Sequence, residues 1–133
     1  MNKNNLGAIV LAAGKGKRMN SKSVNKVALH LADKPMIVHT VGLLEGVKIK
    51  EIVVVVGFAK KSVMNVLGSK IIFAEQRKRL GTGHAVLCGL KKLSKNIEDV
   101  LIINGDDSAF YPQNLIKNLI EMHFLSNAAI TFL

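Results

Sequence analysis

Aromatic residues are scarce in this sequence, and their scarcity argues against a partner that is bound by stacking on aromatic rings. They make up 5% of the 133 residues, with no tryptophan and a single tyrosine. A surface that stacks on the bases of single strands needs exposed aromatic rings. The net charge of +10 would favour nucleic acid, but the cations gather at 15–26 and 77–79, beside glycine turns. A small anionic substrate explains this grouping better, so we expect no nucleic-acid partner.

Cysteine and long apolar runs are also in short supply. The single cysteine, Cys88, permits no internal disulfide, which suits a reducing cytoplasm. Its apolar neighbours indicate a helix in which the thiol packs as a small hydrophobe. No apolar run approaches the roughly 18 residues of a membrane span, and residues 1–5 are too short and polar for a signal peptide. We therefore expect a cytoplasmic protein with no membrane partner.

The apolar segments, which hold much of the 49% hydrophobic content, alternate between strand and helix patterns. The length suits one domain. Uniformly apolar strands need cover on both faces, as in a parallel sheet. The order predicts an α/β fold, a three-layer, doubly wound, Rossmann-like and mostly parallel sheet of about five strands. The expected strands are 6–11, 51–57, 70–75, 100–104 and 128–133, and the helices begin near Asp33, Lys60, His84 and Pro112.

A glycine loop follows the first expected strand, at residues 12–18 (Ala-Ala-Gly-Lys-Gly-Lys-Arg). Small residues allow close approach of backbone to ligand, and glycine lets consecutive N–H groups point inward. No acid occurs between Gly14 and Lys26, while five residues there are basic: Lys15, Lys17, Arg18, Lys22 and Lys26. Donor-rich backbone followed by cations predicts a cradle for a nucleoside triphosphate.

Two other phosphate loops compete with this interpretation. The dinucleotide fingerprint G-x-G-x-x-G/A requires a small third residue, where this chain has Met19. Asp33 stands roughly where its ribose-binding acid belongs, so the fingerprint is weakened but stays open. The Walker loop is absent, because no glycine here precedes Lys and then Ser or Thr. The simpler alternative to a phosphate loop is that residues 12–18 form a flexible connection between strand and helix, with lysines on the surface.

Two more polar loops follow expected strands, at 76–83 and 104–108. Gln76 offers the donor and acceptor that reading a base edge requires, and Gly81 and Thr82 bring backbone and hydroxyl groups. The alternative is a helix start capped by Thr, with Gln on the surface. The plain interpretation of Arg77 to Arg79 is a solvated, charged rim, and a phosphate-facing role for one of the three is left unassigned. In parallel sheets the ligand lies beyond the carboxyl ends of strands, so all three loops should open on one edge.

These strings resemble the sugar-nucleotidyltransferase family. The resemblance rests on Leu-Ala-Ala-Gly-x-Gly-x-Arg-Met from Leu11, the later Lys-Val and Lys-Pro-Met, Leu-Gly-Thr-Gly-His-Ala from Leu80, and the Gly-Asp pair at 105. It is closest to the uridylyltransferase domain of the bacterial N-acetylglucosamine-1-phosphate enzymes and covers only its first half. Two departures stand out: Asn25 precedes Lys26 where the family has proline, in a loop one residue longer, and Lys17 replaces threonine.

The resemblance implies transfer of a nucleotidyl group from a nucleoside triphosphate, with UTP favoured, to a sugar-1-phosphate, with release of pyrophosphate and Mg²⁺ as cofactor. Arg18 would bind the β and γ phosphates, Lys26 the α-phosphate or sugar phosphate, and Asp106 the metal. Residues 1–133 would form the nucleotide-binding portion. The implied nucleotide-binding residues are Leu11, Ala12, Ala13, Gly14, Lys15, Gly16, Lys17, Gln76, Gly81, Thr82, Asn104 and Gly105.

Two expectations remain beside this one. A nucleotide-binding module without turnover is the alternative, because the half that supplies the sugar pocket is not part of the resemblance. The expected strand 128–133 is apolar and uncharged. If it lies at a sheet edge, its free backbone groups form a template for another chain, which predicts self-association.

Overall fold

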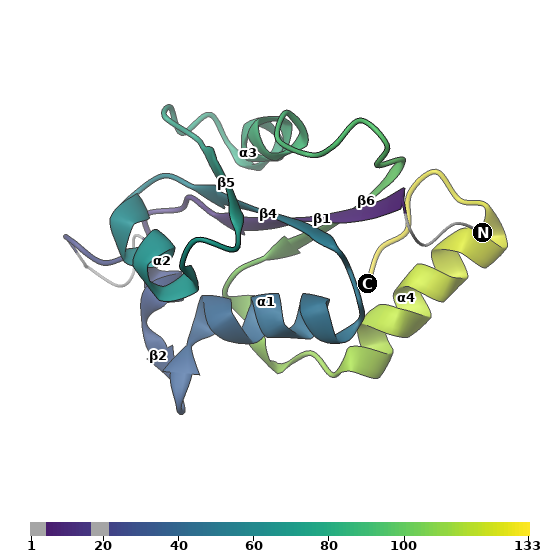
Figure 1. The fold of residues 1–133 in the computed structure, drawn as a ribbon, viewed down its shortest axis with the longest axis horizontal. Helices are drawn as coiled ribbons and strands as arrows, with labels where there is room; N and C mark the ends of the chain where they lie inside the picture. Colours follow the sequence, from purple (N-terminus) through teal and green to yellow (C-terminus); the bar gives the residue numbers. More distant parts are fainter. Residues whose placement is uncertain (1–4, 17–21) are drawn as a thin grey trace.

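The central feature of the computed structural model, which describes residues 5–16 and 22–133, is a four-stranded parallel sheet. Its strands are β1 (Leu6–Ala12), β4 (Glu51–Val56), β5 (Ile72–Glu75) and β6 (Asp99–Asn104). They lie in the order β5-β4-β1-β6, with β1 paired in parallel to both β4 and β6 (Figure 1). The parallel α/β fold predicted from the sequence is thus confirmed.

The strands are apolar throughout because both faces of the sheet are covered. Ile9 and Val53 are register partners on one face, and Val10 and Val54 are partners on the other. All four side chains are fully buried. Alternate side chains of a strand point to opposite faces, so each strand contributes to two separate cores.

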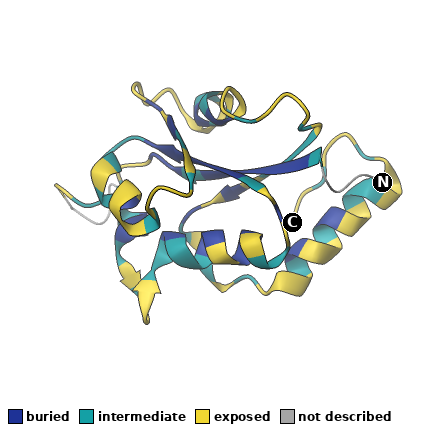
Figure 2. Ribbon diagram, in the orientation of Figure 1, coloured by how far each residue is buried: buried dark blue, intermediate teal, exposed yellow. Residues whose placement is uncertain are grey.

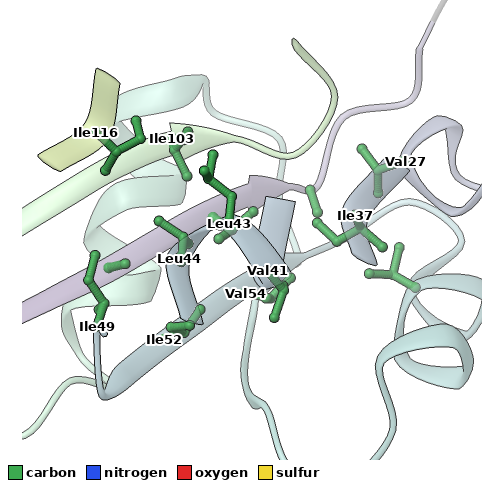
Figure 3. Packing of buried hydrophobic residues seen from close by; sticks show 14 of the residues in the cluster. Val27, Ile37, Val41, Leu43, Leu44, Ile49, Ile52, Val54, Ile103 and Ile116 are labelled. Carbon is green, nitrogen blue, oxygen red and sulfur yellow. The ribbon is translucent and has the colours of Figure 1, made fainter. Parts of the chain in front are cut away.

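Four helices form the outer layers. They are α1 (Met36–Gly46), α2 (Lys60–Leu67), α3 (Thr82–Leu90) and α4 (Gln113–Ser126). Figure 1 shows α3 above the sheet and α1 and α4 below it. The lower core joins Ile37 of α1, Val63 of α2 and Ile116 of α4 to the sheet. Figure 3 shows Ile37 and Ile116 in this core, and Figure 2 shows that the helices turn buried residues toward the sheet. Among the described residues, no helix combines the length and the apolar content that crossing a membrane requires.

Short elements line the approach to the sheet. The 3₁₀ helix η3 (Lys26–Ala28) precedes a small antiparallel ribbon of β2 (His30–Leu31) and β3 (Lys34–Pro35), and η4 (Asp107–Phe110) follows β6. Pro35 is the N-cap of α1, so this helix begins a few residues later than the sequence predicted from Asp33. Thr82 opens α3, two residues earlier than expected.

The fifth strand expected at 128–133 is not formed, because these residues pair with no strand. The tail instead turns back from α4, where the Thr131 hydroxyl lies 2.9 Å from Nδ1 of His123. Ile130 and Phe132 stay 70% and 83% exposed, so the tail's apolar pattern buries little against the sheet. The sheet edges are β5 and β6. Self-association remains a prediction, without the strand that was expected to drive it.

Helix α3 packs closely on the sheet because Gly89, which faces the sheet, has no Cβ. A Cβ added there would lie 2.8 Å from Cγ2 of Ile9 and 3.1 Å from Cγ2 of Val55. Both atoms belong to fully buried, β-branched residues, which cannot swing aside. In α1, by contrast, a Cβ added to Gly42 meets nothing within 4 Å.

We predict opposite effects of alanine at these two glycines. Alanine gains about 1 kcal/mol of helix propensity over glycine. Gly42→Ala should therefore stabilise the protein by up to about that amount, whereas Gly89→Ala should lose the gain to overpacking, which costs about 1–3 kcal/mol. Urea unfolding of both variants measures the difference. A Gly89→Ala protein as stable as Gly42→Ala would contradict the close packing of α3.

Candidate functional site

The three polar loops after the strands open into one cleft, as the sequence predicted. The cleft lies beyond the carboxyl ends of the strands and has a volume of about 840 Å³. Its walls come from the end of β1 and the glycine loop, from η3, from the β5–α3 loop, and from the end of β6. The lining residues are Leu11, Ala12, Ala13, Gly14, Gly16, Asn25, Lys26, Val27, Gln76, Arg79, Gly81, Thr82, Ala85, Asn104 and Asp106.

Most residues expected to bind nucleotide therefore line one space, but two do not. Lys15 turns aside, with its Nζ 5.7 Å from the centre of the Phe58 ring. Gly105 is buried beneath the cleft: its N–H donates to the Leu11 carbonyl at 3.0 Å, and an added Cβ would lie 2.8 Å from Cδ1 of Ile37. Gly105 thus supports the end of β1. The predictions for Lys17 and Arg18 lie outside the described residues.

Lys26 and Asp106 form an ion pair inside the cleft. Nζ of Lys26 donates to Oδ2 of Asp106 at 2.7 Å, and the side chains are 38% and 33% exposed. The other oxygen, Oδ1, accepts the N–H of Asp107 at 2.9 Å. Burial alone would raise the pKa of Asp106, but the hydrogen bond and charge of Lys26, with this backbone donor, hold the pKa below its ordinary value. The carboxylate is therefore ionised at neutral pH.

The oxygen groups here fit a hard divalent cation. Mg²⁺ is usually held by one or two carboxylates together with substrate phosphates, not by a full protein cage. Asp106 supplies one such carboxylate, and Asp107, whose Oδ2 accepts from Asn104 at 3.3 Å, stands beside it. No group of three acidic, histidine or cysteine residues placed to hold a metal occurs in the part of the chain that the structure describes. The residues fit a metal that arrives with a phosphate substrate.

Gln76 is held in place by the loop that follows it. The residue is only 5% exposed, and its Nε2 donates to the Gly81 carbonyl at 3.0 Å and to Nδ1 of His84 at 3.0 Å. The contact with His84 thus helps to orient Gln76.

The start of α3 is formed by glycine and not by threonine. Gly81 is the N-cap, with φ of +97°, and no side chain caps the helix. A residue with a Cβ is strained at this angle, so glycine is required by the turn itself. Thr82, exposed at the first position of α3, keeps its hydroxyl free of a capping role and lines the cleft.

Four lining residues were missed at the sequence level: Asn25, Val27, Arg79 and Ala85. Arg79 is the cation of the 77–79 trio that reaches the cleft, whereas Arg77 lies 3.8 Å from Glu75. Asn25 is 1% exposed and hydrogen-bonded to three separate segments. The only sequence signal for Asn25 was its departure from the proline of the resembled family.

The parallel sheet and the polar cleft beyond its carboxyl ends define a doubly wound α/β protein of the nucleotide-binding type. Within that class, residues 8–133 match the MobA-like NTP transferase domain. The chain belongs to this nucleotidyltransferase family.

The chain is also similar to individual proteins and solved structures. The chain is 38% identical over 129 residues to the bifunctional protein GlmU of Limosilactobacillus fermentum, and 41% identical over 127 residues to GlmU of Caldicellulosiruptor saccharolyticus. Among solved structures, the UDP-glucose pyrophosphorylase of Acinetobacter baumannii superposes with a TM-score of 0.76 at 23% identity. A nucleotidyl transferase of Methanothermobacter superposes with a TM-score of 0.75 at 21% identity.

The alignments cover nearly all of this chain but only part of each matched protein. The two GlmU alignments cover 97% and 94% of this chain but 28% and 27% of those proteins. The two structural superpositions cover 92% and 89% of this chain and 53% and 57% of the solved chains. The chain thus spans about a quarter of the curated relatives and just over half of the solved neighbours.

We predict that the pKa of Asp106 depends on Lys26. In the Lys26→Met variant Asp106 stays partly buried, which raises its pKa, but it loses the hydrogen bond and the charge of Lys26, which lower it. The pKa of Asp106 should therefore rise from below its ordinary value of 3.8 to that value or above. Carboxyl carbon NMR measures it directly. In the wild type, the stability that Asp106 gains from this contact is present above pH 3.8 and is lost as pH falls through the lower folded pKa.

A matched variant controls for the removal of a lysine. Lys60 donates to Glu75 at 2.9 Å at a different place in the fold, and this contact lowers the pKa of Glu75. Lys60→Met should raise the pKa of Glu75 and leave that of Asp106 unchanged. An Asp106 pKa that responds equally to both variants would mean that the 2.7 Å pair does not determine it.

Proposed function

We propose that this protein binds UTP with Mg²⁺ in the cleft and transfers the uridylyl group to a sugar-1-phosphate, releasing pyrophosphate. The observation that carries the proposal is the convergence of the glycine loop, the Lys26–Asp106 pair and the Gln76 loop on one cleft. Glycine-rich backbone and cations suit phosphates, a carboxylate suits their metal, and an amide suits a base edge. Family membership adds the reaction class, and a UTP-bound UDP-glucose pyrophosphorylase is among the structural neighbours.

In the proposed reaction, an oxygen of the sugar phosphate attacks the α-phosphorus of UTP. The bond between the α-phosphorus and the bridging oxygen breaks, and pyrophosphate leaves with that bonding pair. No proton transfer to a protein base is needed, because a phosphate oxygen is already ionised at neutral pH. Catalysis of this kind depends on positioning and on neutralising charge.

The chain's own residues supply both requirements. Lys26, on η3 at the cleft wall, neutralises charge near the α-phosphate once it leaves Asp106. Arg18 binds the β and γ phosphates and stabilises the leaving pyrophosphate. Gln76, Gly81 and Thr82 hold the uracil and ribose, and Asp106 with the neighbouring oxygens holds the metal. Mg²⁺ held by Asp106 would supply Lewis acidity that neutralises negative charge on the phosphates.

Binding without turnover is the second candidate function. The proposed nucleotide site lies wholly within residues 11–106, whereas no sugar pocket distinct from the cleft was identified from the sequence. The substrate, the metal and a cytoplasmic location all remain predictions for this chain.

We predict that UTP with Mg²⁺ binds more tightly than ATP, CTP or NAD in calorimetric titration. Lys26→Ala and Arg18→Ala should each weaken UTP binding by roughly 10- to 150-fold, since a hydrogen bond to a charged group is worth about 1.5–3 kcal/mol. Asp106→Ala should abolish the dependence of binding on Mg²⁺. Lys117→Ala, an exposed lysine on α4, is the matched control and should bind as the wild type does. Tighter binding of NAD would contradict the triphosphate site.

We predict that pyrophosphate is released when UTP and a suitable sugar-1-phosphate are added together. A coupled phosphate assay across a panel of sugar-1-phosphates measures this release, with UTP alone and a Lys26→Ala sample as controls. Release that needs both substrates and is lost in Lys26→Ala supports the transferase. UTP binding with no release from any member of the panel supports the binding module instead.

A further inference from the structure

Asn25 lines the cleft, and its side-chain amide makes hydrogen bonds to several backbone groups around it. Its Nδ2 lies 3.0 Å from the carbonyl oxygen of Ala12, 3.1 Å from that of Gly14 and 2.9 Å from that of Phe58. Its Oδ1 accepts the N–H of Val27 at 3.2 Å. Three carbonyls on one side and an N–H on the other fix the orientation of the amide, because only the NH₂ group donates.

The backbone of Asn25 forms a further link. Its N–H donates to Oγ of Ser62 on α2 at 2.9 Å, and that hydroxyl donates to the Ala59 carbonyl at 2.7 Å. One residue thus joins the glycine loop, the turn after β4 and the first turn of α2. Lys26 follows directly in the chain and begins η3, of which Asn25 is the N-cap.

These contacts determine which backbone groups of the glycine loop remain available. The carbonyls of Ala12 and Gly14 face Asn25, and the carbonyl of Ala13 accepts from the N–H of Phe58 at 3.3 Å. In a trans peptide the N–H of the next residue points the opposite way from the carbonyl. The N–H groups of residues 13–15 are therefore turned away from these acceptors.

The same N–H groups have no acceptor within the described part of the chain. None of the amides of residues 13–16 donates to another described residue. Gly16 has φ of +59°, in the left-handed region. Consecutive backbone amides without internal partners, next to a residue in the left-handed region, can form a concave site for anions. A loop whose carbonyls faced the cleft would instead repel phosphate.

We propose that Asn25 is the positioning residue of this phosphate site: it binds the loop's carbonyls, leaves the amides of residues 13–16 for the phosphates, and anchors Lys26. The proposal rests on the triphosphate binding proposed above and deepens it. Asn25 does this where the resembled family has proline. Proline offers no side-chain donor and no N–H, so this chain holds its longer loop by a different means.

The sharpest variant is Asn25→Pro. Asn25 has φ of −71°, close to the value of about −65° that proline imposes. The substitution thus suits the local backbone while removing every donor of the residue. Asn25→Asp is the complementary change, because it keeps the shape but places carboxylate oxygens against three carbonyls. Asn65→Asp, on the exposed face of α2, controls for the added negative charge.

Calorimetric titration of wild type and variants with UTP, inorganic triphosphate and uridine tests the role. Both Asn25 variants should bind the two triphosphates more weakly by about tenfold or more, the factor that goes with losing a charge-assisted hydrogen bond. Uridine affinity should be unchanged, which a general loss of structure would not allow. Asn65→Asp should match the wild type. Equal triphosphate affinity in the wild type and in both Asn25 variants would overturn the proposal.

A measurement on the wild type alone keeps the test independent of variant folding. In an NMR titration with inorganic triphosphate, the amide resonances of Gly14, Lys15 and Gly16 should shift most. Shifts confined to other residues would overturn the role of Asn25. Binding of inorganic triphosphate without binding of UTP would contradict the proposed function but would still support the phosphate site. A failure of the proposed function can therefore be distinguished from a failure of the role proposed for Asn25.

Discussion

The parallel pairing of β1 with both β4 and β6 is the constraint on which the site depends. Because all four strands run the same way, every loop that leaves a carboxyl end is delivered to one side of the sheet. The register places the end of β1 beside Asn104 and Val56, so the glycine loop has a polar loop on one flank and the turn into α2 on the other. Ala8, Ile9 and Val10 have no exposed surface, which makes β1 a fixed base for the loop that it carries.

Two charged side chains of the cleft, Lys26 and Asp106, form an ion pair that can separate at little cost in free energy. The Lys26–Asp106 pair is about one-third exposed, and partly solvated ion pairs of this kind contribute little net free energy, about 0–1 kcal/mol. The proposed reaction requires the pair to break, so that Lys26 can move to a phosphate and Asp106 to a metal, and this separation therefore costs little. The pair keeps both groups ionised and in the cleft in the meantime. A deeply buried pair would be far more costly to separate, since either charge left alone would lack compensation.

The strands and the convergence of three loops were predictable because their signals are local. A β-branched run such as 51–56 and a glycine after a strand are visible in any short window, and parallel topology then brings the loops together. The strand expected at 128–133 has an equally good local pattern, but a strand also needs a partner edge, which no window of sequence shows. Arg79 could not be told from Arg77 for the same reason: only the path of the loop decides which cation reaches the cleft.

Asn25 shows most clearly why part of the site lay beyond the sequence. Its partners are at positions 12, 14, 58 and 62, and nothing in the residues around 25 indicates them. Read locally, an asparagine before a lysine is an ordinary turn or cap residue. In the fold it binds the backbone carbonyls that a phosphate would find repulsive. In the proposed phosphate site, the glycine loop therefore does not act through its glycines alone: they give the backbone its freedom, and the side chain of Asn25, from a later segment, determines which backbone groups would face the ligand.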